Sequence, residues 1–483
     1  MPGRRTFLLV LALTFAIPLI PMLYTRLLST MSQNTTTAAA PSARRAIVVG
    51  SGLAGLSAAS TLLSAHHPVT LLERLPKPGG NSIKASSGIN GAPTRYQPAP
   101  EDDTFYADTV RSAGAAFADD QSPLRDALIR TLTQRSRDAI YWLADGKGID
   151  LSVVAQLGGH TRARTHRGAG PTPPGAAIVT ALLKELNASP LFTLLTNATV
   201  TRLLPRDGNG GGGGVAGVEY HSSDGKTHEL RGPVVFATGG FAGDAAGLLQ
   251  TYRPDLAGLP STNEAWPGSA PLLTAPAVGG ARLVDMDMVQ VHPTGFVDPE
   301  AVGAPVKFLA AEVLRGEGGV MLRGGKRFVD ELQTRQVVTD RITEVAPDEV
   351  VDGVRVWDVK IVLDEGAYQA AKSHVGFYLF KGLMRKTTVA ELGGEQAVKE
   401  VQAYADAAAG KAGDPLGRKA FGHWELRDVT PESVVYVGRV TPVVHFTMGG
   451  VVINDKAEVL DKDDKPIEGV WAAGEAAESL RKE

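Results

Sequence analysis

A glycine-rich turn near residue 50 constrains the fold of this chain more than any other feature. The apolar run 46–49 predicts a buried strand, and Gly50 to Gly55 has the pattern G-x-G-x-x-G. A small-residue stretch ending near Ser64 predicts a helix, and residues 69–72 predict a second strand. The order strand, glycine turn, helix, strand is typical of a dinucleotide-binding β–α–β unit.

Each glycine of this turn has its own physical role. Gly50 permits the tight turn out of the strand, Gly52 lets a pyrophosphate approach the backbone, and Gly55 lets the helix pack close to the strands. Leu53 and Ala54 open the helix, where free N–H groups and the positive end of the helix dipole favour phosphate. The segment therefore predicts a site for a dinucleotide.

Glu73 ends the second predicted strand, about twenty residues after the turn, where a carboxylate accepts hydrogen bonds from ribose hydroxyls. We expect Glu73 and the adjacent Arg74 to contact the cofactor. An unrelated α/β protein could carry such a turn, and the pattern by itself does not distinguish FAD from NAD.

Composition narrows the chemistry. The chain has 483 residues, which favours two domains, and it contains no cysteine. This excludes disulfides, thiol nucleophiles, cysteine-ligated iron–sulfur clusters and C-x-x-C-H haem attachment. Redox chemistry would then need an organic cofactor or a metal held by other ligands, and we identify no metal-binding residues. A formal net charge of −3 gives no reason to expect a nucleic-acid partner.

The segment after Glu73 favours a flavin. Residues 79–82 and 85–90 are rich in glycine, serine and asparagine, which can run closely along a ribityl chain and bond through backbone and hydroxyl groups. The candidate cofactor contacts here are Gly80, Asn81, Ser82, Ser86, Ser87 and Gly88.

Several further motifs occur in an order that resembles one family. They are Q-L-G-G-H at 156–160, R-T-H-R at 164–167, V-H-P-T-G at 291–295 and H-F-T-M-G-G at 445–450. With the glycine turn, they make the chain from about Ala46 to Glu475 resemble the soluble fumarate reductases of the fungal type. The resemblance extends more distantly to the flavoprotein subunit of succinate dehydrogenase.

This resemblance implies an α/β fold with FAD as cofactor. It implies a discontinuous Rossmann-like FAD-binding domain at 46–283 and 441–483, and an inserted α+β capping domain at 284–440. Gly239, Gly474 and Glu475 fall in motifs that contact the flavin in the family. Membrane-bound members attach FAD to a histidine near the first segment; Asn81-Ser82 offers none, so we expect non-covalent FAD.

The resemblance also implies the residues that act on a small dicarboxylate such as fumarate or succinate. His292 and His445 match the ligands of the substrate carboxylates. Arg335 matches the proton donor, and Glu312 and Arg315 match the relay that supplies the proton. Without the family context, these last three residues would be read as an ordinary surface salt-bridge group.

The chain departs from the family pattern at four places. Residues 266–271 read W-P-G-S-A-P where relatives carry T-G-D-G, Ala311 stands in place of a threonine, and Gln336 in place of an aspartate. The sequence also ends shortly after Glu475, where relatives continue with a glycine-rich loop, a substrate-binding arginine and a helix. We therefore expect a C-terminus that is truncated, through an incomplete gene model or in a degenerate paralogue.

Three questions stay open at the level of sequence. The reaction is fumarate reduction, or the chain is a non-catalytic flavin-binding paralogue, or it acts on a ketosteroid, urocanate or aspartate. No second dinucleotide fingerprint is present, so the electron donor is reduced free flavin or an NADH-linked protein.

Residues 1–45 resemble a targeting segment. The apolar run at 7–24 could anchor the chain in the endoplasmic reticulum membrane, or the segment could be a mitochondrial presequence. A start at Met31 would give a cytosolic form.

Overall fold

The computed structural model describes residues 45–98, 101–114, 123–206 and 214–477. The part of the chain from Arg45 onward forms one compact unit. The predicted targeting segment, apart from Arg45, and the final residues 478–483 lie outside the described residues. Within the described part of the chain, no helix is both long and apolar enough to cross a membrane.

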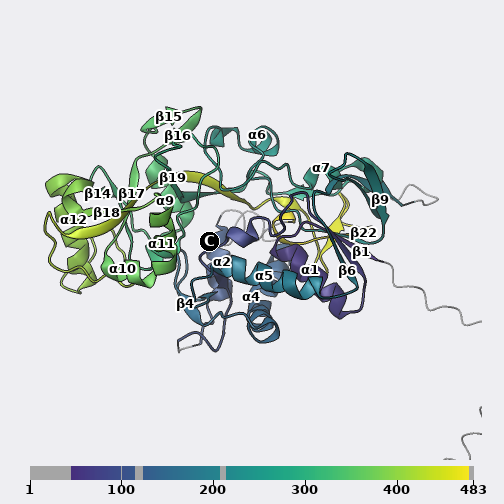
Figure 1. Cartoon of the computed structure of the whole chain (residues 1–483), viewed down its shortest axis with the longest axis horizontal. Coiled ribbons are helices and arrows are strands. Elements are labelled where there is room, and N and C mark those ends of the chain that lie inside the picture. Colours follow the sequence, from purple (N-terminus) through teal and green to yellow (C-terminus); the bar gives the residue numbers. More distant parts are fainter. Residues whose placement is uncertain (1–44, 99–100, 115–122, 207–213, 478–483) are drawn as a thin grey trace, which may run out of the picture. The chain divides into compact units, whose positions relative to one another are not determined.

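A six-stranded sheet forms the core of the dinucleotide-binding part (Figure 1). Neighbouring strands are parallel except for the pair β21 and β22, which is antiparallel. In spatial order the strands are β21 (Glu458–Leu460), β22 (Pro466–Ala472), β10 (Val234–Phe236), β1 (Ala46–Val49), β2 (Val69–Leu72) and β6 (Phe192–Leu195). Both ends of the described chain thus contribute to one sheet, and the predicted Rossmann-like fold is confirmed.

The two faces of this sheet are covered by different elements. Helices α1 (Leu53–Ser64) and α5 (Pro174–Asn187) pack on one face. A meander packs on the other and consists of β7 (Thr199–Pro205), β8 (Val215–His221) and β9 (Thr227–Arg231). Burial from both sides explains why β1 is an uninterrupted apolar run and why β2 has one polar residue, the buried Thr70.

Register fixes where the functional loops emerge. Val49 pairs with Leu72 on one side and with Phe236 on the other. Because these strands are parallel, their carboxyl ends meet at one edge of the sheet, which is where ligands bind in such folds. The glycine turn, Glu73 and Gly239 all follow these ends.

Helices and a small sheet complete this part of the chain. They are α2 (Phe105–Ala113), α4 (Pro123–Tyr141), the π-helical turn Trp142–Gly146, and a sheet of β3 (Ile89–Asn90), β5 (Thr165–Arg167) and β4 (Val153–Ala155). Short elements link them to the second sheet: α6 (Leu248–Tyr252), α7 (Ala270–Leu273), and β11 (Leu283–Val284) paired with β20 (Gly450–Val451).

A second sheet, whose described strand pairs are all antiparallel, occupies the region predicted as the cap (Figure 1). Its strands are β12 (Val289–Phe296), β19 (Val434–Thr447), β17 (Val359–Leu363), β13 (Val320–Arg323) and β14 (Lys326–Arg327), with β18 (Arg385–Thr388) also paired to β19. The helices are α8 (Val313–Gly316), α9 (Arg335–Thr343), α10 (Glu365–Ala370), α11 (Lys372–Phe380) and α12 (Gly394–Ala408), and a hairpin joins β15 (Glu349–Val351) to β16 (Val354–Val356).

Strand β19 and helix α9 carry residues of the predicted site. β19 begins at Val434 and ends at Thr447, and pairing resumes only at Gly450. Helix α9 begins at Arg335, because the hydroxyl of Thr334 accepts a hydrogen bond from the backbone N–H of Val337 and caps the helix. That cap places Arg335 in the first turn of α9.

Candidate functional site

The glycine turn has the geometry that its sequence predicts. Gly50 has φ of 100°, and a Cβ there would lie 2.3 Å from the carbonyl oxygen of Ala237. A Cβ at Gly55 would lie 1.9 Å from the carbonyl oxygen of Gly50. No side chain fits either position, so the close approach of α1 to β1 and β10 depends on glycine.

Glu73 lies in a fixed position at the end of β2. Its side chain is buried; one carboxylate oxygen accepts hydrogen bonds from the backbone N–H (3.1 Å) and the hydroxyl of Ser51, and the other accepts from Leu75 N–H (2.8 Å). These contacts hold Glu73 beside the glycine turn. Its bond to a ribose stays a prediction.

Arg74 stacks on Trp266, with its guanidinium carbon 4.6 Å from the centre of the indole ring. Trp266 belongs to the segment 266–271, where the resemblance implied T-G-D-G. Its aromatic ring packs against a predicted cofactor residue.

The segment 79–82 packs against the start of α1. A Cβ at Gly80 would lie 3.6 Å from the Cα of Gly52. The hydroxyl of Ser82 accepts a hydrogen bond from the backbone N–H of Leu53 (2.9 Å), which is one of the free donors at this helix end. Asn81 lies between them in the sequence and is exposed.

The following residues reach the cap. The carbonyl oxygen of Ser86 bonds to Nε2 of His374 on α11 (2.6 Å). Ser87 precedes Gly88, which has φ of 135° and leaves 2.5 Å between a built Cβ and the carbonyl oxygen of His166. This part of the predicted flavin segment therefore lies between the small β3–β5 sheet and the cap.

The last predicted cofactor motif folds back onto the first. A Cβ at Gly474 would lie 2.8 Å from that of Ala54. One carboxylate oxygen of Glu475 accepts a hydrogen bond from the backbone N–H of Thr447 (2.9 Å), and burial raises the pKa of Glu475 to about 7. A buried carboxyl group that is partly protonated at neutral pH can both accept and donate hydrogen bonds.

Beside these motifs, an open backbone position follows a buried hydroxyl that has no hydrogen-bond partner among the described residues. A Cβ at Gly239 would meet no atom within 4 Å. The hydroxyl of the preceding residue, Thr238, is buried and has no hydrogen-bond partner among the described residues. An open position and an unpaired hydroxyl at the carboxyl edge of the sheet fit a polar dinucleotide.

We expect Gly50→Ala to abolish flavin binding. The added methyl would collide with the backbone after β10 and would force an unfavourable positive φ. The measurement is the ratio of flavin to protein absorbance after purification. Gly148→Ala is the matched control, because Gly148 also has positive φ (67°) but open space around it, and it should keep its flavin. Full flavin content in the Gly50 variant would contradict this account of the turn.

The two predicted substrate ligands face each other. His292 lies on β12 and His445 on β19, and their ring centres are 5.2 Å apart in an edge-to-face arrangement. His292 is fully buried, and its Nε2 has no hydrogen-bond partner among the described residues. Its Nε2 lies 4.0 Å from a carboxylate oxygen of Glu312.

Both imidazoles are neutral at physiological pH. Burial, and then the charge of Arg335, lowers the pKa of His445 to about 3 and that of His292 well below its usual value. The backbone N–H of Thr294 donates to Nδ1 of His292 (3.2 Å), so the single proton of the neutral ring lies on Nε2. His292 therefore presents an N–H donor rather than a cation.

Glu312, Arg315 and Arg335 form one buried ion-pair group. Arg335 donates from Nε to one carboxylate oxygen of Glu312 (2.9 Å), and Nη2 of Arg315 lies 3.1 Å from the other. Burial raises the pKa of Glu312, but the charges of Arg335 and Arg315 outweigh this and leave it at about 2. The structure thus brings the three predicted residues together, while their roles in proton transfer stay predictions.

The sequence did not identify Gln290 and Gly158 as part of this group. Gln290 accepts a hydrogen bond from Nη1 of Arg335 (2.5 Å), and the backbone N–H of Gly158 donates to Glu312 (3.1 Å). Gln290 lies two residues before His292 on β12, so strand alternation could have indicated their common face. Gln336 bonds to Asp340 instead (2.7 Å).

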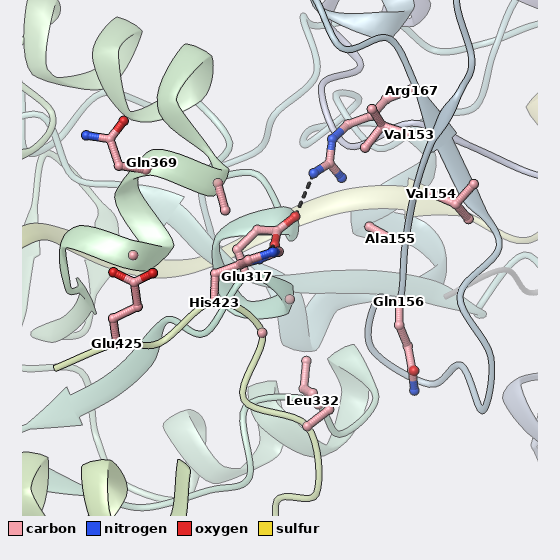
Figure 2. Close-up of a pocket in the computed structure, with 15 residues that line it drawn as sticks. Val153, Val154, Ala155, Gln156, Arg167, Glu317, Leu332, Gln369, His423 and Glu425 are labelled. Carbon is pink, nitrogen blue, oxygen red and sulfur yellow. Dashed lines mark hydrogen bonds and ion pairs between the residues drawn. The ribbon is translucent and has the colours of Figure 1, made fainter. Parts of the chain in front are cut away.

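A cavity of about 510 Å³ lies elsewhere, between the β4–β5 hairpin and the cap. Figure 2 shows the guanidinium of Arg167 directed towards Glu317, with 2.6 Å between Nη2 and the carboxylate. None of its lining residues is a predicted site residue. Substrate binding at the His292–His445 pair stays a prediction.

Comparison with known proteins agrees with this geometry. The FAD binding domain family matches residues 45–481. Fumarate reductase 1 of Saccharomyces cerevisiae is 41% identical over 456 residues, which cover 89% of this chain and 92% of the yeast protein. The chain belongs to the fumarate reductase family of FAD-binding flavoproteins. FAD is accordingly its cofactor.

Other members of this flavoprotein family show the same relation. A fumarate reductase of Schizosaccharomyces pombe is 38% identical, with 89% of this chain and 83% of that protein covered. Among solved structures, the open conformation of a flavocytochrome c3 fumarate reductase superposes with a TM-score of 0.64 at 27% identity. That match covers 92% of this chain and 74% of the flavocytochrome chain.

Proposed function

We propose that this flavoprotein reduces fumarate to succinate. The observation that carries the proposal is the buried pair of neutral histidines beside the Glu312–Arg335 ion pair, in a chain that binds FAD. When bound and reduced by an electron donor, FAD would supply the hydride that is added to one carbon of the double bond. The chain's own residues must hold the substrate carboxylates and deliver a proton to the other carbon.

His292 and His445 are suited to hold a carboxylate. They project from adjacent strands with their rings in edge-to-face contact, so one carboxylate could accept from both. A neutral imidazole can donate its N–H to a substrate carboxylate. A protonated imidazole would instead form a buried ion pair with Glu312. This agrees with the low pKa of both rings.

Arg335 is the proposed proton donor. An arginine side chain has a pKa above about 12, so it acts as an acid only towards a strongly basic carbon and only with rapid reprotonation. Glu312 contacts both Arg335 and Arg315, and it could pass a proton from one guanidinium to the other. Only Arg335 of the two arginines is partly exposed, with 16% of its side chain accessible, which suits contact with a substrate.

We also propose the domain boundaries that the family resemblance implied. Strands from 46–72, 192–236 and 458–472 share one sheet, which supports an FAD-binding domain made of 46–283 and 441–483. The cap would comprise 284–440, with β19 running through its second boundary. For localisation, we keep the proposal of a targeting segment at 1–45. For the electron donor, we keep the proposal of reduced free flavin or an NADH-linked donor.

We expect the flavin to be non-covalent, because Asn81 and Ser82 stand where a histidine would form the link. Acid precipitation of the purified protein should release all of the flavin into the supernatant. Flavin that remains on the precipitated polypeptide would show a covalent bond and would refute this prediction.

Succinate production tests the proposed function. With a chemically reduced viologen dye as donor, the purified full chain should form succinate from fumarate and should not reduce urocanate. With an oxidised dye as electron acceptor, it should not oxidise a 3-ketosteroid or aspartate. A flavin-containing protein that is inactive with fumarate under these conditions would overturn the proposal.

A further inference from the structure

A chain of side-chain hydrogen bonds links the flavin-binding segment to His445. Nδ2 of Asn81 donates to Oδ1 of Asn263, and Nδ2 of Asn263 lies 2.8 Å from the carbonyl oxygen of His445 and 3.3 Å from Oγ1 of Thr262. Oγ1 of Thr262 is in turn 2.7 Å from Nδ1 of His445. These contacts connect three segments that are far apart in sequence.

The direction of each bond follows from what each atom can do. The carbonyl oxygen of His445 only accepts, so the Asn263 atom that faces it is the amide nitrogen. The other side-chain atom of Asn263 is then its oxygen, which accepts from Asn81. The orientation of both amides is therefore set by the backbone of β19.

The same reasoning extends to Thr262. Asn263 uses one amide N–H towards the carbonyl of His445 and the other towards Oγ1 of Thr262. The threonine oxygen is then an acceptor from Asn263. Among the described residues, its own hydroxyl proton has no other hydrogen-bond acceptor than Nδ1 of His445, so donation to Nδ1 is the arrangement that pairs this proton. An imidazole that accepts at Nδ1 and is neutral carries its proton on Nε2.

We propose that Thr262, held by Asn263, is a positioning residue that fixes His445 in the Nε2–H tautomer and so makes it a donor to the substrate carboxylate. The effect of this tautomer on substrate binding rests on the proposed function, whereas the assignment of the tautomer does not. His292 reaches the same state through the backbone N–H of Thr294, so both histidines would present N–H groups. The opposite tautomer of His445 would turn a lone pair towards the carboxylate.

The link to Asn81 adds a second consequence. Asn263 is buried, and Asn81 belongs to the segment predicted to run along the flavin. The orientation of a substrate ligand would then depend on the ordering of that segment. Positioning of this kind commonly determines which nitrogen of a histidine is available.

Thr262→Val removes the hydroxyl at nearly constant volume, and Thr262→Ser restores it. In protein labelled with 15N-histidine, His445 (assigned by loss of its signals in His445→Gln) should show a protonated Nε2 and an accepting Nδ1 in the natural chain and in the serine variant. In the valine variant, a substantial Nδ1–H population should appear. Thr251→Val is the matched control, because Thr251 is exposed and bonds to the carbonyl of Gly247 (3.0 Å); it should change nothing.

Succinate binding, followed by its perturbation of the flavin absorbance, supplies a second measurement. The valine variant should bind succinate roughly 10- to 100-fold more weakly, with the serine variant close to the natural chain. Unchanged imidazole signals and unchanged succinate affinity in the valine variant would overturn the inference, even where fumarate is reduced normally. Failure of the natural chain to reduce fumarate would instead refute the proposed function, and the imidazole signals would still test the tautomer.

Discussion

Arg335→Gln is expected to lower the rate constant for fumarate reduction by roughly 10²- to 10⁴-fold, the range usually lost with a general acid. Glutamine keeps a hydrogen-bonding amide in the first turn of α9 but cannot donate the proton or carry the charge. Flavin content should stay unchanged, because the hydrogen bonds of Arg335 to described residues go to Glu312 and Gln290, neither of which is a predicted cofactor residue. The measurement is succinate formation per bound flavin.

Arg341→Gln is the control for this substitution. Arg341 lies on the same helix, but its side chain is 55% exposed and pairs only with Glu344 among the described residues. Exposed pairs of this kind contribute little, so activity should remain within about twofold of the natural chain. An Arg335 variant that keeps more than about a tenth of the activity would be incompatible with general-acid catalysis by Arg335.

Glu312→Gln is expected to reduce both activity and stability. The buried carboxylate faces Arg335 and Arg315, and removing its charge would leave two buried or half-buried guanidinium groups without their shared partner. Breaking a buried ion pair in this way typically costs about 3–5 kcal/mol in the free energy of unfolding. Turnover should be lost as well, because Arg335 could no longer be reprotonated through Glu312.

The stability loss should depend on pH with a definite sign. The pKa of Glu312 is about 2 in the folded protein, below its ordinary value of 4.5. Its contribution is then complete above pH 4.5 and is lost as the pH falls towards 2. Urea denaturation should therefore show a larger difference between the natural chain and Glu312→Gln at pH 7 than at pH 4. The exposed Glu344→Gln should show no such difference; equal losses at both pH values for Glu312→Gln would contradict the assigned charge state.

Local backbone requirements explain why the dinucleotide part could be predicted from sequence. The turn at Gly50 needs a positive φ, and the packing of α1 needs the missing side chain of Gly55; both needs are met by residues adjacent in sequence. The runs at 46–49 and 69–72 predicted two strands, and these are β1 and β2 of the six-stranded sheet. The family's fold is confirmed by the order of the six strands.

The contacts that complete the site depend on tertiary packing and were not predicted. Gln290, Thr262 and Asn263 gain their significance only because β12 and β19 pair and the loop before α7 lies along β19. Nothing in the local sequence of an asparagine or glutamine indicates which charged side chain it will meet. Likewise, the stacking of Trp266 on Arg74 joins residues nearly two hundred positions apart.

Anaerobic reoxidation of the reduced protein by fumarate tests the central claim most directly. The full chain would be purified with its flavin, reduced chemically without oxygen, and mixed with fumarate while the flavin absorbance is followed. We predict that the oxidised flavin spectrum returns and that one succinate forms for each flavin. A flavin that binds but stays reduced in the presence of fumarate, and reoxidises only when oxygen is admitted, would contradict the claim.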